Sequence, residues 1–172
     1  VTTLQYEIFS GGNLLQISIP DSVTGMGNAI FQNWSKLQKV KLPKARYNIS
    51  DYTFAGCTSL EEIQLPKTVT TIWPHAFDGC SSLKKVEWSD CLESIKDNAF
   101  KGCTSLTEIV IPNTVRELGN EAFRNCDGLE KIVIPNSVTT IGNGVLYDCD
   151  SLTNISVGAG ISKLSESCFE HC

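Results

Sequence analysis

Apolar residues recur along this chain with a fixed period of 23 residues. The position that shows the period best holds Ile8, Phe31, Phe54, Phe77, Phe100, Phe123, Leu146 and Phe169. No insertion or deletion interrupts the spacing. A fixed period of roughly 20–29 residues is typical of solenoids, in which each repeat is one coil and equal positions stack.

Each repeat contains a short stretch in which apolar and polar residues alternate. A leucine column precedes it at Leu14, Leu37, Leu60, Leu83, Leu106, Leu129 and Leu152. The two apolar columns of the stretch are Ile17, Val40, Ile63, Val86, Ile109, Ile132 and Ile155, and then Ile19, Leu42, Leu65, Trp88, Ile111, Ile134 and Val157. This alternation predicts a β-strand with one buried face. Prolines that follow at once, such as Pro43 and Pro112, end the strand.

The rest of each coil predicts an irregular return arm and then about one turn of α- or 3₁₀-helix. Three residues before the Phe position stand the helix N-cap candidates Asn28, Asp51, Asp97, Asn120 and Asn143. Two residues after it stand Asn33, Gly56, Gly79, Gly102, Asn125 and Asp148, which tolerate a left-handed backbone and can close a helix. One coil alone cannot bury its apolar columns, whereas stacked coils can.

The best-formed repeat, residues 98–112, contains the pattern A-F-x-G-C-x-x-L-x-x-I-x-I-P. Together with the strict period, this pattern resembles the BspA-like class of leucine-rich repeats over nearly the whole chain. The resemblance implies an α/β repeat: a right-handed solenoid of 23-residue coils, with a parallel β-sheet on one face and short helical turns opposite. It also implies a cell-surface or secreted microbial protein, because family members are described as adhesins or host-protein binders.

The unbroken repeat predicts that residues 1–172 form a single solenoid domain of about seven coils, with 1–19 as a degenerate first coil. The chain stops at Cys172, three residues after Phe169, and no polar cap is visible there. Solenoids normally close their ends with such a cap. We therefore expect a piece of a longer array, or an end that a partner covers.

The charge pattern argues against nucleic acid as a partner. The formal net charge is −5, and we identify no Lys/Arg cluster and no basic stripe with aromatic residues. No apolar run approaches ~20 residues, so no membrane span is expected in this chain.

Six of the eight cysteines fill one column of the repeat: Cys57, Cys80, Cys103, Cys126, Cys149 and Cys172. Free cysteine behaves as a small buried hydrophobe, so we expect buried free thiols, although a disulfide between stacked coils stays open as an alternative. Cys91 stands in another column and is the best candidate for an exposed thiol. Cys168, His171 and Cys172 form the only tight cluster of possible metal ligands, but Cys168 fits a small-residue core column.

No catalytic motif stands out in the sequence. The two histidines, His75 and His171, have no Ser, Cys or Asp partner at a recognisable spacing, and no phosphate-binding or H-E-x-x-H motif occurs. We expect neither an enzyme nor a cofactor or metal site.

The exposed strand positions offer the candidate binding surface. One exposed column alternates in charge, with Lys39, Glu62, Lys85, Glu108 and Lys131, and predicts a self-neutralising ladder across neighbouring coils. The column two residues on holds Lys41, Gln64, Glu87, Val110 and Val133, in which two valines face water side by side. We predict a protein-binding surface formed by Lys41, Gln64, Glu87, Val110, Val133 and Lys131.

Two functions fit this surface. The first is a protein-binding module of a surface adhesin, whose ligand would be a host extracellular-matrix or plasma protein or a microbial protein. The second is a structural spacer that carries another domain, because seven strands at ~4.8 Å each span about 33 Å. Trp73 before Pro74 is a further candidate contact, since its column otherwise holds small or polar residues.

Overall fold

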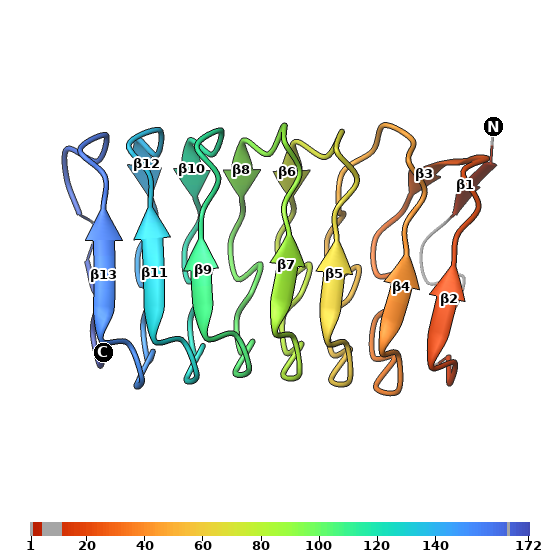
Figure 1. The fold of residues 1–172 in the computed structure, drawn as a ribbon, viewed down its shortest axis with the longest axis horizontal. Helices are drawn as coiled ribbons and strands as arrows, with labels where there is room; N and C mark the ends of the chain where they lie inside the picture. The colour runs from red at the N-terminus through yellow and green to blue at the C-terminus, as the bar shows by residue number, and fades with distance from the viewer. Residues whose placement is uncertain (1, 5–11, 165) are drawn as a thin grey trace.

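The computed structural model describes residues 2–4, 12–164 and 166–172 as an elongated β-solenoid of about six turns (Figure 1). One row of strands consists of β2 (Gln16–Ser18), β4 (Lys39–Lys41), β5 (Glu62–Gln64), β7 (Lys85–Glu87), β9 (Glu108–Val110), β11 (Lys131–Ile134) and β13 (Asn154–Val157). The second row consists of β1 (Thr2–Leu4), β3 (Val23–Met26), β6 (Thr71–Ile72), β8 (Ser94–Ile95), β10 (Glu117–Leu118) and β12 (Thr140–Ile141). Ile8 and residues 5–7 of the predicted first coil lie outside the described residues.

The first row confirms the predicted strands and their register. Lys131 lies opposite Glu108 and Asn154, and every pairing in this row is parallel with the same 23-residue offset. The predicted single sheet, however, is divided into three ladders: β2–β4, β5–β7 and β9–β11–β13. The breaks lie between β4 and β5 and between β7 and β9.

The return arm is more regular than the sequence suggested. Its two-residue strands form a second parallel sheet in the order β12–β10–β8–β6, which Ile49 extends by an isolated bridge to Ile72. The apolar positions of this arm are buried at Val69, Leu92, Val115 and Val138. Each turn of the solenoid therefore closes around a core between two sheets rather than under one.

The predicted helical turns are wrong: the described residues form β-turns there and no helix. The closers two residues after the Phe position do have a left-handed backbone, as Gly56 shows with a φ of 72°. A second left-handed column, two residues before the Phe position, includes Tyr52 (φ 56°) and His75 (φ 57°). A right-handed helical turn cannot continue through these residues.

Hydrogen bonding between coils explains the same departure. In the turn around Phe54, the amides of Tyr52, Phe54 and Gly56 donate to carbonyls of the next coil at 3.2, 2.8 and 2.8 Å. Every second amide is thus used between coils and is not available to an intrahelical bond. The cap candidates act between coils too, since Asp97 accepts the Asn120 amide at 2.8 Å and Asn120 accepts the Asn143 amide at 2.9 Å.

The core is a stack of equal side chains along the solenoid axis. Phe31, Phe54, Phe77, Phe100 and Phe123 are fully buried, and neighbouring rings lie nearly parallel with centroids 5.0–5.3 Å apart. This spacing lies within the favourable range for stacked aromatic rings. Trp34, at 2% exposure, closes one end of the stack edge-on against Phe31.

The cysteine column confirms the prediction of free, buried thiols. All eight cysteines are free, and the five column members from Cys57 to Cys149 are completely buried. The prediction is wrong for the sixth member, Cys172, which is exposed because no described coil follows it. Each thiol donates a hydrogen bond to the Phe carbonyl of the preceding coil, for example Cys103 to Phe77 at 3.3 Å. Burial raises the pKa of Cys57 and of Cys149 to about 12. Cys91 is exposed, as predicted.

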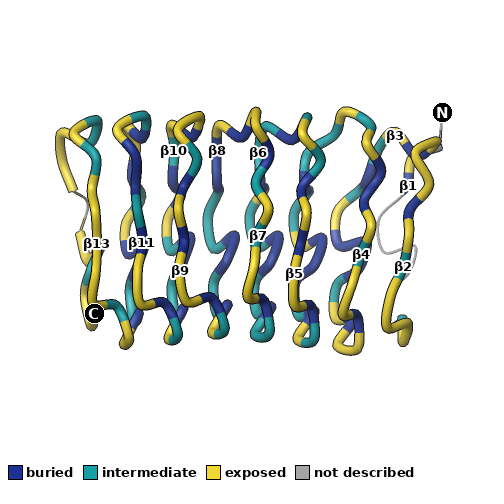
Figure 2. The backbone as a smooth tube through the Cα atoms, in the orientation of Figure 1, coloured by how far each residue is buried: buried dark blue, intermediate teal, exposed yellow. Residues whose placement is uncertain are grey.

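Core positions open toward water at both ends of the described solenoid. Leu14 is exposed although its column is otherwise buried from Leu37 to Leu129. Figure 2 shows β13 exposed along its length, and Ile155 and Val157 are nearly 40% exposed (38% and 39%). The predicted burial of these columns therefore holds only where a coil lies on either side.

The predicted charge ladder forms only in part. Lys131 pairs with Glu108 across β9 and β11 at 2.6 Å. Lys85 instead pairs with Glu87 of its own strand at 2.6 Å, and Glu108 is not its ladder neighbour because the sheet is broken there. Within the described ranges, Lys39 forms no ion pair.

We predict that native protein treated with a thiol reagent is labelled first at Cys91. The thiolate is the reactive form, and the buried column thiols have a raised pKa, so they should react only after unfolding. Mass spectrometry of labelled peptides with and without denaturant measures this order, and Cys91→Ser should remove the fastest label. An intact mass showing three or four disulfides would contradict free thiols.

We predict that Lys131→Glu destabilises the protein more than Lys39→Glu does. Lys131→Glu replaces an ion pair with two facing carboxylates and should cost about 0.5–1 kcal/mol of unfolding free energy at low salt. Lys39 has no ion pair to lose, and its neighbour across the break is not hydrogen-bonded to it. Urea unfolding at low and high salt compares the two variants. Equal losses of unfolding free energy would contradict this account and favour an uninterrupted charge ladder.

Candidate functional site

The six predicted binding residues all lie on the first row of strands but divide into two groups. Val110 and Val133 are register partners in β9 and β11, with Val110 52% exposed and Val133 half-buried. Lys131 lies two residues before Val133 and is held by Glu108. The adjacent valines and this neutralised pair therefore form one surface, the valine patch (Val110, Val133, Lys131).

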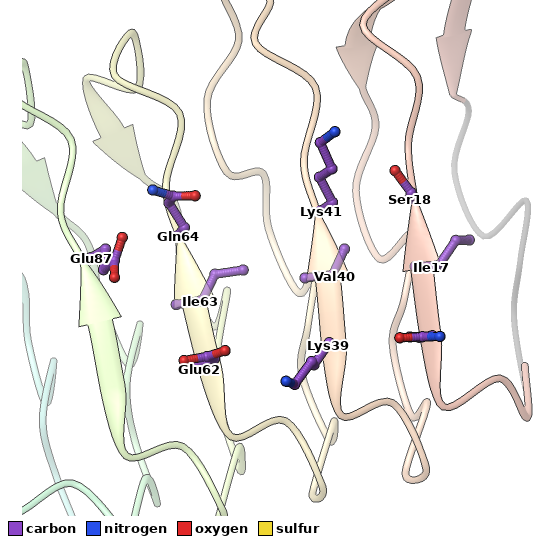
Figure 3. A pocket seen from close by; sticks show the side chains of 10 residues that line it. Ile17, Ser18, Lys39, Val40, Lys41, Glu62, Ile63, Gln64 and Glu87 are labelled. Carbon is purple, nitrogen blue, oxygen red and sulfur yellow. The ribbon is translucent and has the colours of Figure 1, made fainter.

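The other three residues, Lys41, Gln64 and Glu87, line an open cleft of about 610 Å³ on the same row of strands (Figure 3). Figure 3 shows Lys39 reaching from β4 toward β5, while Lys41 points along β4 toward the strand's carboxyl end. Lys85 donates to Glu87, and this hydrogen bond lowers the pKa of the Glu87 carboxyl. Val40 and Ile63 contribute apolar lining.

The cleft spans β2, β4 and β5 and reaches Glu87 of β7, so the break between β4 and β5 lies within it. A second hollow of about 330 Å³ continues it toward the return arm and shares Val40, Lys41 and Gln64 with the first. At the start of the break the Glu61 amide reaches the Gln38 carbonyl at 3.4 Å, but the strands beyond it are unpaired. We name the two hollows together the β4–β5 cleft.

The break coincides with the irregular second coil. Arg46 stands in the column that holds Val23 and Val69 in the neighbouring coils, and it is exposed. Tyr47 is half-buried beside it and donates its hydroxyl to the Pro43 carbonyl at 3.0 Å. Burial is the main cause that raises the pKa of Tyr47, so the hydroxyl stays protonated as a donor. The irregular segment thus lies in the same coil as β4, next to the break.

One coil carries an excess of positive charge that the sequence analysis missed. Residues 36–46 do form a Lys/Arg cluster, contrary to our prediction, with Lys36, Lys39, Lys41, Lys44 and Arg46. In the part of the chain that the structure describes, none of these five forms a salt bridge. Counting charge by coil rather than over the chain would have shown this excess.

Other candidate residues do not gather into a reactive site. Trp73 is 42% exposed, as proposed, but lies on the turn side of the second sheet. His75 stacks on Tyr52 with centroids 4.6 Å apart and contacts Asp78 at 2.8 Å. Among the described residues, no three His, Cys, Asp or Glu side chains come together as a metal site, and no helix is long and apolar enough to cross a membrane.

Solved structures share this architecture. The T. pallidum leucine-rich repeat protein is 32% identical and superposes with a TM-score of 0.78 over 94% of this chain and 74% of its own. A leucine-rich cell surface protein of Faecalibacterium prausnitzii is 22% identical, with a TM-score of 0.61 over 100% of this chain and 69% of its own. The pneumococcal vaccine antigen PcpA is 19% identical, with a TM-score of 0.59 over 96% and 56%. The last two show a shared fold alone.

The sequence itself gives the family. No curated protein sequence matches the chain significantly. The family model described as a BspA type leucine-rich repeat region matches residues 1–104 and 70–172, in six copies, and so covers the whole chain. The 23-residue register, the stacked Phe column and this match lead to one conclusion: the chain belongs to the BspA-type leucine-rich repeat family.

Proposed function

We propose that this chain is a non-catalytic protein-binding module of a cell-surface or secreted protein. The observation that carries the proposal is the valine patch, where Val110 is 52% exposed next to Val133 on an otherwise polar strand face. The BspA-like resemblance, which implies a cell-surface or secreted protein, supports the location. The ligand class we propose is a host extracellular-matrix or plasma protein.

The valine patch can contribute to binding without long-range electrostatic attraction of the ligand. Lys131 and Glu108 neutralise each other at 2.6 Å, so the patch offers apolar contact with a polar rim. Such a contact gains affinity from the apolar area removed from water. The Phe stack behind it holds the strands in register, so little ordering is needed when a ligand binds.

We expect the double variant Val110→Asp, Val133→Asp to lose binding. The test is a surface-binding assay of the 172-residue chain against a panel of matrix and plasma proteins at up to tens of micromolar, the range of weak specific contacts. The variant removes two apolar contacts and adds two negative charges. The affinity of a ligand that contacts the patch should therefore fall roughly tenfold or more.

A matched variant separates the patch from general charge. Asn113→Asp with Ser151→Asp adds the same two negative charges at exposed turn positions and should bind like the unaltered protein. Binding that survives in the valine variant would place the contact elsewhere on the solenoid. No binding by the unaltered chain to any panel protein would favour the structural spacer.

A further inference from the structure

The two halves of the β4–β5 cleft differ in charge. The larger hollow is lined by Lys39 and Lys41 together with Glu62 and Glu87, so its charges balance. The half nearer the return arm is lined by Lys41, Lys44 and Lys67, and its lining, all of it described, contains no Asp or Glu. We call this second half the lysine cleft.

The lysine cleft also has an apolar floor. Leu42 and Leu65 lie at its base, with the half-buried Val40 and Pro66 beside them. The cleft therefore combines three lysine side chains with an apolar surface in a hollow of about 330 Å³. A ligand that fills it must offer an apolar group and an anionic group side by side.

Carboxylates near the lysine cleft do not neutralise it. Asp21 accepts a hydrogen bond from the backbone amide of Lys44 at 3.0 Å rather than from its ammonium. Asp90 approaches Lys67 at 3.5 Å, but both side chains are largely exposed, at 72% and 87%. Exposed pairs of this kind contribute little and exchange readily with a competing anion. Lys41 and Lys44 form no salt bridge within the described residues.

We propose that the lysine cleft binds a peptide segment of the partner protein in which an acidic side chain stands next to an apolar one. The proposal rests on the proposed function and names the partner's chemistry. The apolar side chain packs over Leu42 and Leu65, and the carboxylate lies among Lys41, Lys44 and Lys67. A uniform polyanion such as a sulfated glycan fits less well, because its continuation across the face meets Glu62 and Glu87.

The experiment uses the full 172-residue chain and fluorescently labelled synthetic peptides. The probe alternates glutamate with leucine, and two comparison peptides replace its glutamates with glutamine or its leucines with serine. We expect the glutamate–leucine peptide to saturate the protein at about 100 μM and each comparison peptide to bind roughly tenfold more weakly. Binding should weaken as salt screens the lysines.

Charge reversal locates the site. Lys41→Glu with Lys44→Glu should abolish peptide binding, whereas Lys101→Glu with Lys163→Glu makes the same change in net charge outside the cleft and should preserve it. A thermal unfolding curve for each variant confirms folding. Equal loss in both variants, or no peptide binding, overturns the proposal.

Two further outcomes keep this proposal apart from the general one. Binding of a sulfated oligosaccharide in preference to the peptide would overturn the peptide assignment in favour of a glycan. A protein ligand found in the panel assay that binds the Lys41→Glu, Lys44→Glu variant unchanged would overturn the lysine cleft and leave the binding module intact. If that ligand no longer binds this variant but still binds the Lys101→Glu, Lys163→Glu control, both the binding module and the lysine cleft are supported.

Discussion

The coils of this protein are held together at the Phe position, where each backbone amide donates to the next coil. The amides of Phe31, Phe54, Phe77, Phe100 and Phe123 donate at 2.8–2.9 Å to carbonyls 22 residues further along. The carbonyl of each of these residues accepts a thiol from the following coil. A buried hydrogen bond contributes about 1 kcal/mol, but leaving either group unpaired inside the stack costs more. The strict period follows, because an added residue would shift both partners at once.

This constraint explains which sequence predictions succeeded. The strands, the stacked aromatic column and the buried thiols depend on what one coil presents to its neighbours at equal positions, and a period without insertions carries that information. Cys103, for example, repeats because both its size and its S–H donor fit beneath Phe77. The prediction of helical turns was wrong for the complementary reason. Asp97 and Gly102 have the identities of helix caps and closers, yet every second amide of their turn donates to the next coil, and the amides between them close β-turns rather than a helix.

The candidate site could be predicted only in part. Val110 and Val133 were found from the column they share, since register alone makes them neighbours. The β4–β5 cleft needed coordinates, because it arises where hydrogen bonds between coils are missing, and no residue type marks a missing bond. Two weaker signals were present in the sequence: the irregular Arg46–Tyr47 segment and the five cations of the same coil. Averaging charge over the whole chain hid the second signal.

The Phe column thus keeps the solenoid continuous on one side and allows the strand row to open on the other. The amides at one position of the repeat distinguish closed from open parts of the strand row. Those of Ile19, Leu65 and Ile111 donate to the next coil at 2.9–3.0 Å. Leu42 and Trp88 occupy the same column at the two breaks, and within the described residues their amides donate no such bond. Amide hydrogen exchange followed by NMR compares the exchange rates of these five backbone amides at single-residue resolution. Rapid exchange at Leu42 and Trp88 with slow exchange at Ile19, Leu65 and Ile111 is the expected result, whereas equal protection at Leu42 and Leu65 would show a closed sheet and contradict the cleft.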